Sequence, residues 1–253
     1  MKKVIQNTLQ EIGKQKGITI LFAVESGSRG WGFSSKDSDY DVRFVYVRSK
    51  NEYLEINERA DFLDFPINDE LDINGWDLQK FLKLLYASNA TPFEWMQSPV
   101  FYYKNNEVFN IIFEQLGSFY CQQTIIHHYL GLVRKMLSDL DNPTIKLKTL
   151  FYILRSLLAA KYSFVYTKFP SMEFSKLVHL IDKENVLFEI KRLLELKTNS
   201  SEKDISSISL DLKNFIKDTF HFLNSVDKIK SKGTFEVKVL NQTFLKILDY
   251  ADN

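Results

Sequence analysis

Two short strand-like segments joined through a glycine-containing turn place the strongest constraint on how this chain can fold. Residues 18–24 are an unbroken run of apolar, β-branched and aromatic side chains, which is typical of a buried strand, and the run leads directly to Gly27. Residues 42–47 form a second strand pattern. A strand, a glycine turn, a polar connection and another strand, in this order, predict part of a small mixed sheet.

The turn and the start of the second strand carry side chains suited to binding a phosphate and a metal ion. Glycine at position 27 lets the backbone approach a ligand closely, and the Ser28 hydroxyl adds a donor for an anion. If the second strand begins near Asp39, Asp39 and Asp41 project from the same face. Two adjacent carboxylates repel each other unless a cation lies between them, and Mg²⁺ prefers carboxylate and phosphate oxygens.

A phosphate-binding turn beside a carboxylate metal site suggests nucleotidyl transfer. In-line attack on an α-phosphate is well served by two Mg²⁺ ions, for which Mn²⁺ can substitute, and a third carboxylate from a neighbouring strand would complete one ion site. Asp72 has apolar flanks typical of such a strand, so we favour it. Asp77 is the alternative, although three residues after Asn74 it is also placed to cap a helix.

Composition and charge restrict the class of protein further. The chain has 253 residues, a formal net charge of +1 and a single cysteine, Cys121, so a general polyanion binder and an intramolecular disulfide are not expected. It contains no apolar run of about 18 residues and no secretory signal pattern, so we expect a cytoplasmic protein without a membrane partner. Residues 37–77 contain twelve acids and four bases, and residues 130–170 contain seven bases and two acids. This asymmetry fits an acidic metal-binding half and a basic phosphate-binding half.

The pattern along the chain predicts an α+β protein in two parts. Residues 61–65 and 70–73 can pair as a hairpin, with Pro66 and residues 68–69 in its turn. Helical periodicity begins near residues 74–77, and almost everything beyond residue 91 is amphipathic. We therefore expect a small mixed-sheet α+β domain at residues 1–90 and a helical domain at residues 91–253.

These motifs resemble a known family. Gly27-Ser28, followed by Asp39-Tyr40-Asp41 and a later carboxylate, is similar to the DNA polymerase beta-like nucleotidyltransferase superfamily, and residues 25–33 and 37–43 resemble its RNA ligase-associated, RNA-repair branch. The resemblance covers residues 20 to 180. It implies a palm-like sheet, a nucleoside triphosphate donor such as ATP, Ser28 on the triphosphate, and Asp39 and Asp41 on Mg²⁺.

Several further side chains are candidates for contact with the nucleotide. Arg29 is placed to donate to a triphosphate, and Arg43, on the strand face of the aspartates, is placed to pair with one of them or to contact substrate. Lys148, Tyr152 and Arg155 form one stripe of a helix, which suits a cleft wall or a solvated face. The aromatic side chains at positions 31 and 33 can stack on a base, although packing is the favoured interpretation.

The sequence thus predicts an enzyme that moves a nucleoside monophosphate from a triphosphate to a hydroxyl. The acceptor can be an RNA end, a protein side chain or a small molecule. The alternative is a nucleotide- or RNA-binding partner protein that has lost turnover. Two neighbouring carboxylates favour the enzyme, because a binding protein has no need of that repulsion.

Overall fold

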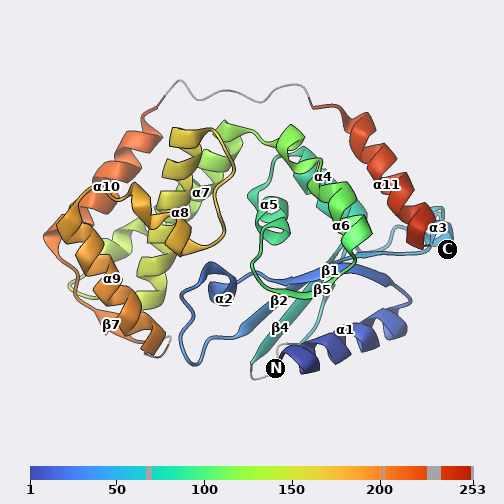
Figure 1. The fold of residues 1–253 in the computed structure, drawn as a ribbon, viewed down its shortest axis with the longest axis horizontal. Helices are drawn as coiled ribbons and strands as arrows, with labels where there is room; N and C mark the ends of the chain where they lie inside the picture. The colour runs from blue at the N-terminus through green and yellow to red at the C-terminus, as the bar shows by residue number, and fades with distance from the viewer. Residues whose placement is uncertain (67–69, 200, 202, 227–234, 252–253) are drawn as a thin grey trace. The chain divides into compact units, whose positions relative to one another are not determined.

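The computed structural model describes residues 1–66, 70–199, 201, 203–226 and 235–251 (Figure 1). The chain forms two compact units that alternate along the sequence. The first contains Met1–Gly27, Asp39–Phe119 and Thr234–Asn253, and the second contains Ser28–Ser38 and Tyr120–Gly233. From the sequence we expect two folding domains that meet at residue 90. This division stays a prediction.

The first unit is built on a five-stranded mixed sheet with the strand order β3-β4-β2-β1-β5. β2 lies at the centre, antiparallel to β1 and parallel to β4, and both edge pairs, β3–β4 and β1–β5, are antiparallel. The strands are β1 (Thr19–Glu25), β2 (Tyr40–Val47), β3 (Phe62–Asp64), β4 (Leu71–Asp77) and β5 (Phe101–Lys104). The α+β class expected from the sequence is confirmed. Residues 62–64 do form an antiparallel pair, but with residues 74–76 and not with the expected residues 70–73, and residues 68–69 of the predicted turn lie outside the described residues.

Alternate residues of the central strands face two different layers. Val42, Phe44 and Tyr46 are fully buried on the side covered by helix α1 (Lys2–Lys16), whose Ile5 and Leu9 complete that core. Asp41, Arg43 and Val45 point to the opposite side. That side is covered by α4 (Leu78–Tyr86), α5 (Ala90–Met96) and α6 (Asn106–Phe113), so Asp41 and Arg43 lie on the face of β2 opposite the α1 core (Figure 1).

Most helices of the first unit begin at a residue whose side chain accepts from the first-turn amides. Asp77 accepts from Gln79 N at 2.8 Å, and Asn89 and Asn105 do the same for the next two helices. Aromatic rings pack these helices on the sheet, with Phe22 edge-on to Phe81 at 5.7 Å. The helices are α3 (Lys50–Tyr53), α4 (Leu78–Tyr86), α5 (Ala90–Met96), α6 (Asn106–Phe113), η1 (Leu116–Phe119) and α11 (Val237–Ala251).

The second unit is mainly helical, with a two-stranded sheet. The long helices α7 and α8 pack on each other, and α8 is buried along most of its length. Its elements are α2 (Ser28–Trp31), α7 (Gln122–Met136), η2 (Leu137–Asp141), β6 (Ile145–Lys146), α8 (Leu147–Tyr166), η3 (Phe174–Lys176), η4 (Val178–Leu180), α9 (Glu184–Asn199), β7 (Ile205–Ser206) and α10 (Leu210–Asn224).

Element boundaries differ from expectation where a local feature overrides periodicity. Phe174–Lys176 and Val178–Leu180 form two separate 3₁₀ turns and not one continuous helix. Helical structure starts at Leu78 and not at residues 74–77, because those residues extend the pairing of β4 with β2. The strand β5 was not predicted, since its four residues follow a proline and carry no alternating pattern.

Candidate functional site

Asp41 and Asp72 come together because β2 and β4 are parallel and in register. The pairing places Asp41 beside Asp72, and Arg43 beside Asn74. Paired residues of neighbouring strands point to the same face, so both carboxylates lie at the start of their strands on the face opposite α1. The predicted proximity of a third carboxylate is therefore found for Asp72, on the strand next to Asp41.

Arg43 lies against both carboxylates. Its Nη2 donates to Asp72 Oδ2 at 2.6 Å and to Asp41 Oδ1 at 3.4 Å, and its Nη1 donates to the carbonyl oxygens of Asp72 and Val42 at 2.9 and 3.0 Å. The side chains of Arg43, Asp41 and Asp72 are 15%, 29% and 23% exposed. The ion-pair role considered for Arg43 is confirmed, and the cation that relieves the carboxylate repulsion here is a guanidinium.

The glycine turn touches this site directly. An added Cβ on Gly27 would lie 1.7 Å from Asp41 Oδ2, so only glycine leaves room for that carboxylate. The turn is also tied to β2 by the backbone, since Ser26 N donates to the Asp41 carbonyl at 2.9 Å. The sequence predicts that the backbone approaches a ligand closely at Gly27. In the structure, the group that would lie nearest to a Cβ added there is the Asp41 carboxylate.

Glu25 positions both sides of this contact, a role the sequence analysis missed. Its carboxylate is fully buried and accepts from Gly27 N at 3.2 Å and Asp41 N at 3.0 Å, while Tyr102 OH donates to its other oxygen at 2.6 Å. Burial raises the pKa of Glu25, and these hydrogen bonds oppose the rise. An acid as the last residue of an otherwise apolar buried strand was the available signal.

Asp39 differs from expectation in its local structure. The strand begins at Tyr40, so Asp39 directly precedes it and is exposed, and a shared face for Asp39 and Asp41 stays a prediction. Among the residues that the structure describes, no group of three or more histidine, cysteine, aspartate or glutamate side chains is arranged to hold a metal ion. Mg²⁺ needs only one or two carboxylates when substrate phosphates supply other ligands, and the oxygen donors of Asp41 and Asp72 fit such a site.

Asp77 has the structural role considered as its alternative. It is the N-cap of α4 itself, not a partner of Asn74, and its second oxygen accepts from Tyr53 OH at 2.9 Å. Only 4% of the residue is exposed, and burial raises the pKa of its carboxyl group. Asp77 lies at the end of β4, whereas Asp72 lies near its beginning.

The second unit contains the other predicted nucleotide contacts. Ser28 is buried and begins the short helix α2, whose last turn closes by hydrogen bonds from the amides of residues 32 and 33 to the Ser28 carbonyl. Arg29 Nη2 donates to the Ser38 carbonyl at 2.6 Å. Arg29 thus fastens the end of the segment that leads to Asp39 in the sequence, and triphosphate contacts of Ser28 and Arg29 stay predictions.

The predicted stripe on α8 is unevenly exposed. Lys148 and Tyr152 are half-buried, but Arg155 is 2% exposed, and its guanidinium carbon lies 4.6 Å from the centre of the Trp31 ring. Tyr152 packs edge-on against the same ring at 4.8 Å. The packing interpretation of Trp31 therefore holds in the described contacts, and nucleotide contact by the three stripe residues stays a prediction.

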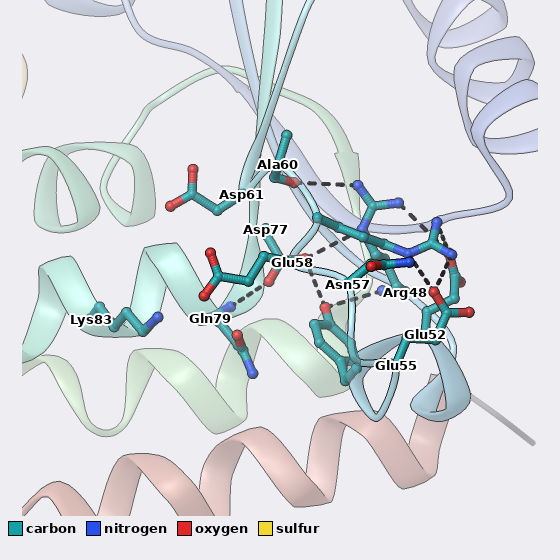
Figure 2. A pocket seen from close by; sticks show the side chains of 12 residues that line it. Arg48, Glu52, Glu55, Asn57, Glu58, Ala60, Asp61, Asp77, Gln79 and Lys83 are labelled. Atoms are coloured by element: carbon teal, nitrogen blue, oxygen red, sulfur yellow. Dashed lines mark hydrogen bonds and ion pairs between the residues drawn. The ribbon is translucent and has the colours of Figure 1, made fainter.

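A polar cavity of about 490 Å³ lies at the other end of β2 and β4 (Figure 2). It is about 20 Å along the strand from Asp41, since each residue advances about 3.3 Å. Figure 2 shows its ion pairs gathering around Arg48 and Glu52, and Arg59 pairs with Glu52 at 3.0 Å. The lining residues are Arg48, Glu52, Tyr53, Glu55, Asn57, Glu58, Arg59, Ala60, Asp61, Asp77, Gln79 and Lys83. The glycine turn lies elsewhere, so we place the candidate site at Asp41 and Asp72.

Comparison with known proteins identifies the family of the chain. Residues 1–246 match the family described as the RNA repair pathway DNA polymerase beta family, RlaP. The chain belongs to this family. A relative described as uncharacterized protein YcgL, from Bacillus subtilis (strain 168), is 32% identical over 252 residues, which cover 98% of this chain and 97% of YcgL. The family resemblance seen in the sequence is thereby confirmed, and it makes the protein nucleotidyltransferase-like.

Among solved structures, a crystal structure of a nucleotidyltransferase-like protein from Exiguobacterium sibiricum 255-15 is similar to this RlaP family member. It has 12% sequence identity and a TM-score of 0.32, over 98% of this chain and 81% of that chain. At this level of similarity we draw no conclusion from it. No helix in the described part of the chain is long and apolar enough to cross a membrane.

Proposed function

We propose that this RlaP family member transfers a nucleoside monophosphate from a nucleoside triphosphate to a hydroxyl acceptor, with an RNA end as the acceptor. The observation that carries the proposal is the in-register pair of Asp41 and Asp72 beside the Gly27 turn. A bound divalent ion would lower the pKa of the attacking hydroxyl and stabilise the departing pyrophosphate. The acceptor oxygen forms a bond to the α-phosphorus. The bond between that phosphorus and the oxygen that joins the α- and β-phosphates breaks, and pyrophosphate leaves.

The chain's own residues have distinct parts in this proposal. Asp41 and Asp72 supply carboxylate oxygens on adjacent strands, and Asp39, just before β2, supplies a third. Glu25 Oε1 accepts hydrogen bonds from the backbone amides of both Gly27 and Asp41. This shared acceptor holds the glycine turn against Asp41, the proposed metal ligand. Mg²⁺, or Mn²⁺ in its place, is the expected ion, because the donors are carboxylate and phosphate oxygens.

Support for RNA comes from the family and from the basic residues 130–170. Neutralising several phosphates at once releases counterions, so RNA binding of this kind weakens steeply as salt rises. Lys146 is exposed and Lys148 is half-buried at the start of α8. The pair Lys146→Ala, Lys148→Ala should therefore weaken binding of short RNA at low salt and reduce its salt dependence.

The deciding experiment incubates the protein with Mg²⁺ and an α-phosphate-labelled triphosphate, in separate reactions with a short RNA or with a protein extract as acceptor, and measures both pyrophosphate and labelled products. Asp41→Asn should abolish labelling, while Asp61→Asn, an exposed carboxylate paired with Lys80 outside the site, should not. Label on RNA supports the proposal. Label on a protein partner indicates protein nucleotidylation, and absence of pyrophosphate release with every acceptor indicates the inactive binding protein.

A further inference from the structure

The contacts of Arg43 suggest a role that the proposed reaction does not require. An arginine has five N–H donors, and Arg43 uses four of them on two carboxylates and two carbonyl oxygens of β2 and β4. The oxygens that it engages, Asp72 Oδ2 and Asp41 Oδ1, belong to the carboxylates to which we assign the metal. A metal ion and the guanidinium therefore compete for the same two carboxylates.

We propose that Arg43 is an internal counter-ion that closes the carboxylate site until a nucleotide arrives with its metal. This inference rests on the proposed function and concerns how that site is controlled. Without metal, Asp41 and Asp72 would repel each other, and Arg43 offsets part of that repulsion by its contacts at 3.4 and 2.6 Å. A divalent ion alone must compete with the guanidinium for these carboxylates and overcome its charge.

A triphosphate changes this competition in two ways. Its oxygens supply ligands that the protein lacks, so the metal gains coordination without further carboxylates. It also offers the released guanidinium a new acceptor, because arginine binds phosphate with strong charge-assisted hydrogen bonds. Metal binding to the unaltered protein should therefore depend on nucleotide, with Arg43 as the positioning residue that makes it so.

The test measures Mn²⁺ binding without nucleotide, by the electron paramagnetic resonance signal of free Mn²⁺. Arg43→Gln should bind Mn²⁺ at least about tenfold more tightly than the unaltered protein, because it removes a unit charge a few ångströms from a divalent ion. Arg48→Gln is the matched control, since Arg48 follows the other end of β2 and pairs with Glu52 and Asp77. This control should leave Mn²⁺ affinity unchanged.

A second variant covers the case in which Arg43→Gln fails to fold. Arg43→Lys keeps the charge but cannot make the four-bond contact, so it should bind Mn²⁺ more tightly than the unaltered protein and less tightly than Arg43→Gln. Affinity for Mn²⁺ that is equal or weaker in the Arg43 variants overturns the inference.

Repeating the titration with a non-hydrolysable triphosphate separates this failure from failure of the proposed function. If Mn²⁺ binds the unaltered protein only with the analogue and the Arg43 variants behave identically, the metal site stands and the counter-ion role falls. If no variant binds Mn²⁺ even with the analogue, the metal-dependent function falls too, and the inference with it.

Discussion

Gly27→Ala tests whether the turn and the carboxylate form one site. The new Cβ would lie 1.7 Å from Asp41 Oδ2, 2.6 Å from Asp41 Cγ and 2.9 Å from Asp41 Cβ. Carbon atoms in contact are normally separated by about 3.5 to 4.0 Å, so the side chain must move by roughly 1.5 to 2 Å. Rotation about the Asp41 side chain alone is insufficient, because its own Cβ is also too close.

The backbone has little freedom to relieve this overlap. Glu25 Oε1 holds the amides of both Gly27 and Asp41, and Ser26 N donates to the Asp41 carbonyl. Overpacking of a well-packed region costs about 1–3 kcal/mol of unfolding free energy. A misplacement of about 1 Å at a reacting centre can reduce turnover about a hundredfold. We therefore expect both losses in Gly27→Ala.

Urea unfolding measures the first loss, and Mg²⁺-dependent pyrophosphate release measures the second. Gly117→Ala is a matched control, because nothing lies within 4 Å of a Cβ added there. A Gly27→Ala protein that matches Gly117→Ala in stability, and keeps release within about twofold of the unaltered rate, would refute the geometric argument. Loss of stability without loss of release would show that the turn is structural only.

Three further results are expected. Asp72→Asn should lower turnover at least about a hundredfold with little loss of stability. Asp77→Asn should lower the free energy of unfolding by about 1 kcal/mol or less, because asparagine still caps α4. Kinetics and melting curves would show the opposite pattern if Asp77 were catalytic. The raised pKa of Asp77 means that the folded state binds this proton more tightly than the unfolded state does. The contribution of Asp77 to stability therefore falls as the pH rises from 3.8 through the raised pKa, and the melting temperature falls with it. Asp77→Asn should make this fall in melting temperature smaller. Mg²⁺ with a triphosphate should raise the melting temperature, and the double change Asp39→Asn, Asp41→Asn should abolish the metal-dependent part; an unchanged shift would remove these two residues from the metal site.

The elements with strong local signals were predictable. Apolar runs locate the buried strand at residues 18–24 and the strands β3 and β4, and helical periodicity locates α1, α9 and α10. The predicted ends of these elements differ from the observed ends by a few residues. Asp77 shows how local signals mislead by a short distance. Its helix-capping role was foreseen, but the strand pairing of β4 carries the chain to residue 77 before the helix can begin.

The carboxylate pair was only partly predictable, because it depends on sheet register. Apolar flanks identified Asp72 as a strand residue, yet its place beside Asp41 requires that β4 run parallel to β2 with that alignment. The repulsion argument was also incomplete. It was made for Asp39 and Asp41 and named only a metal ion, whereas Arg43, on the same strand as Asp41, places a guanidinium against Asp41 and Asp72.

A residue of α9, for which the sequence offered no role, contacts the segment that connects the glycine turn to Asp39. Lys197 is 1% exposed, and its ammonium donates to Ser35 Oγ at 2.8 Å, across 162 residues of chain. Ser35 N in turn donates to Ser38 Oγ, and Arg29 holds the Ser38 carbonyl. A buried lysine is costly unless its donors are satisfied, so this contact constrains the segment between the glycine turn and Asp39. Helix α9 therefore helps to fix the conformation of that connecting segment, which local sequence patterns cannot reveal because both partners are ordinary polar residues.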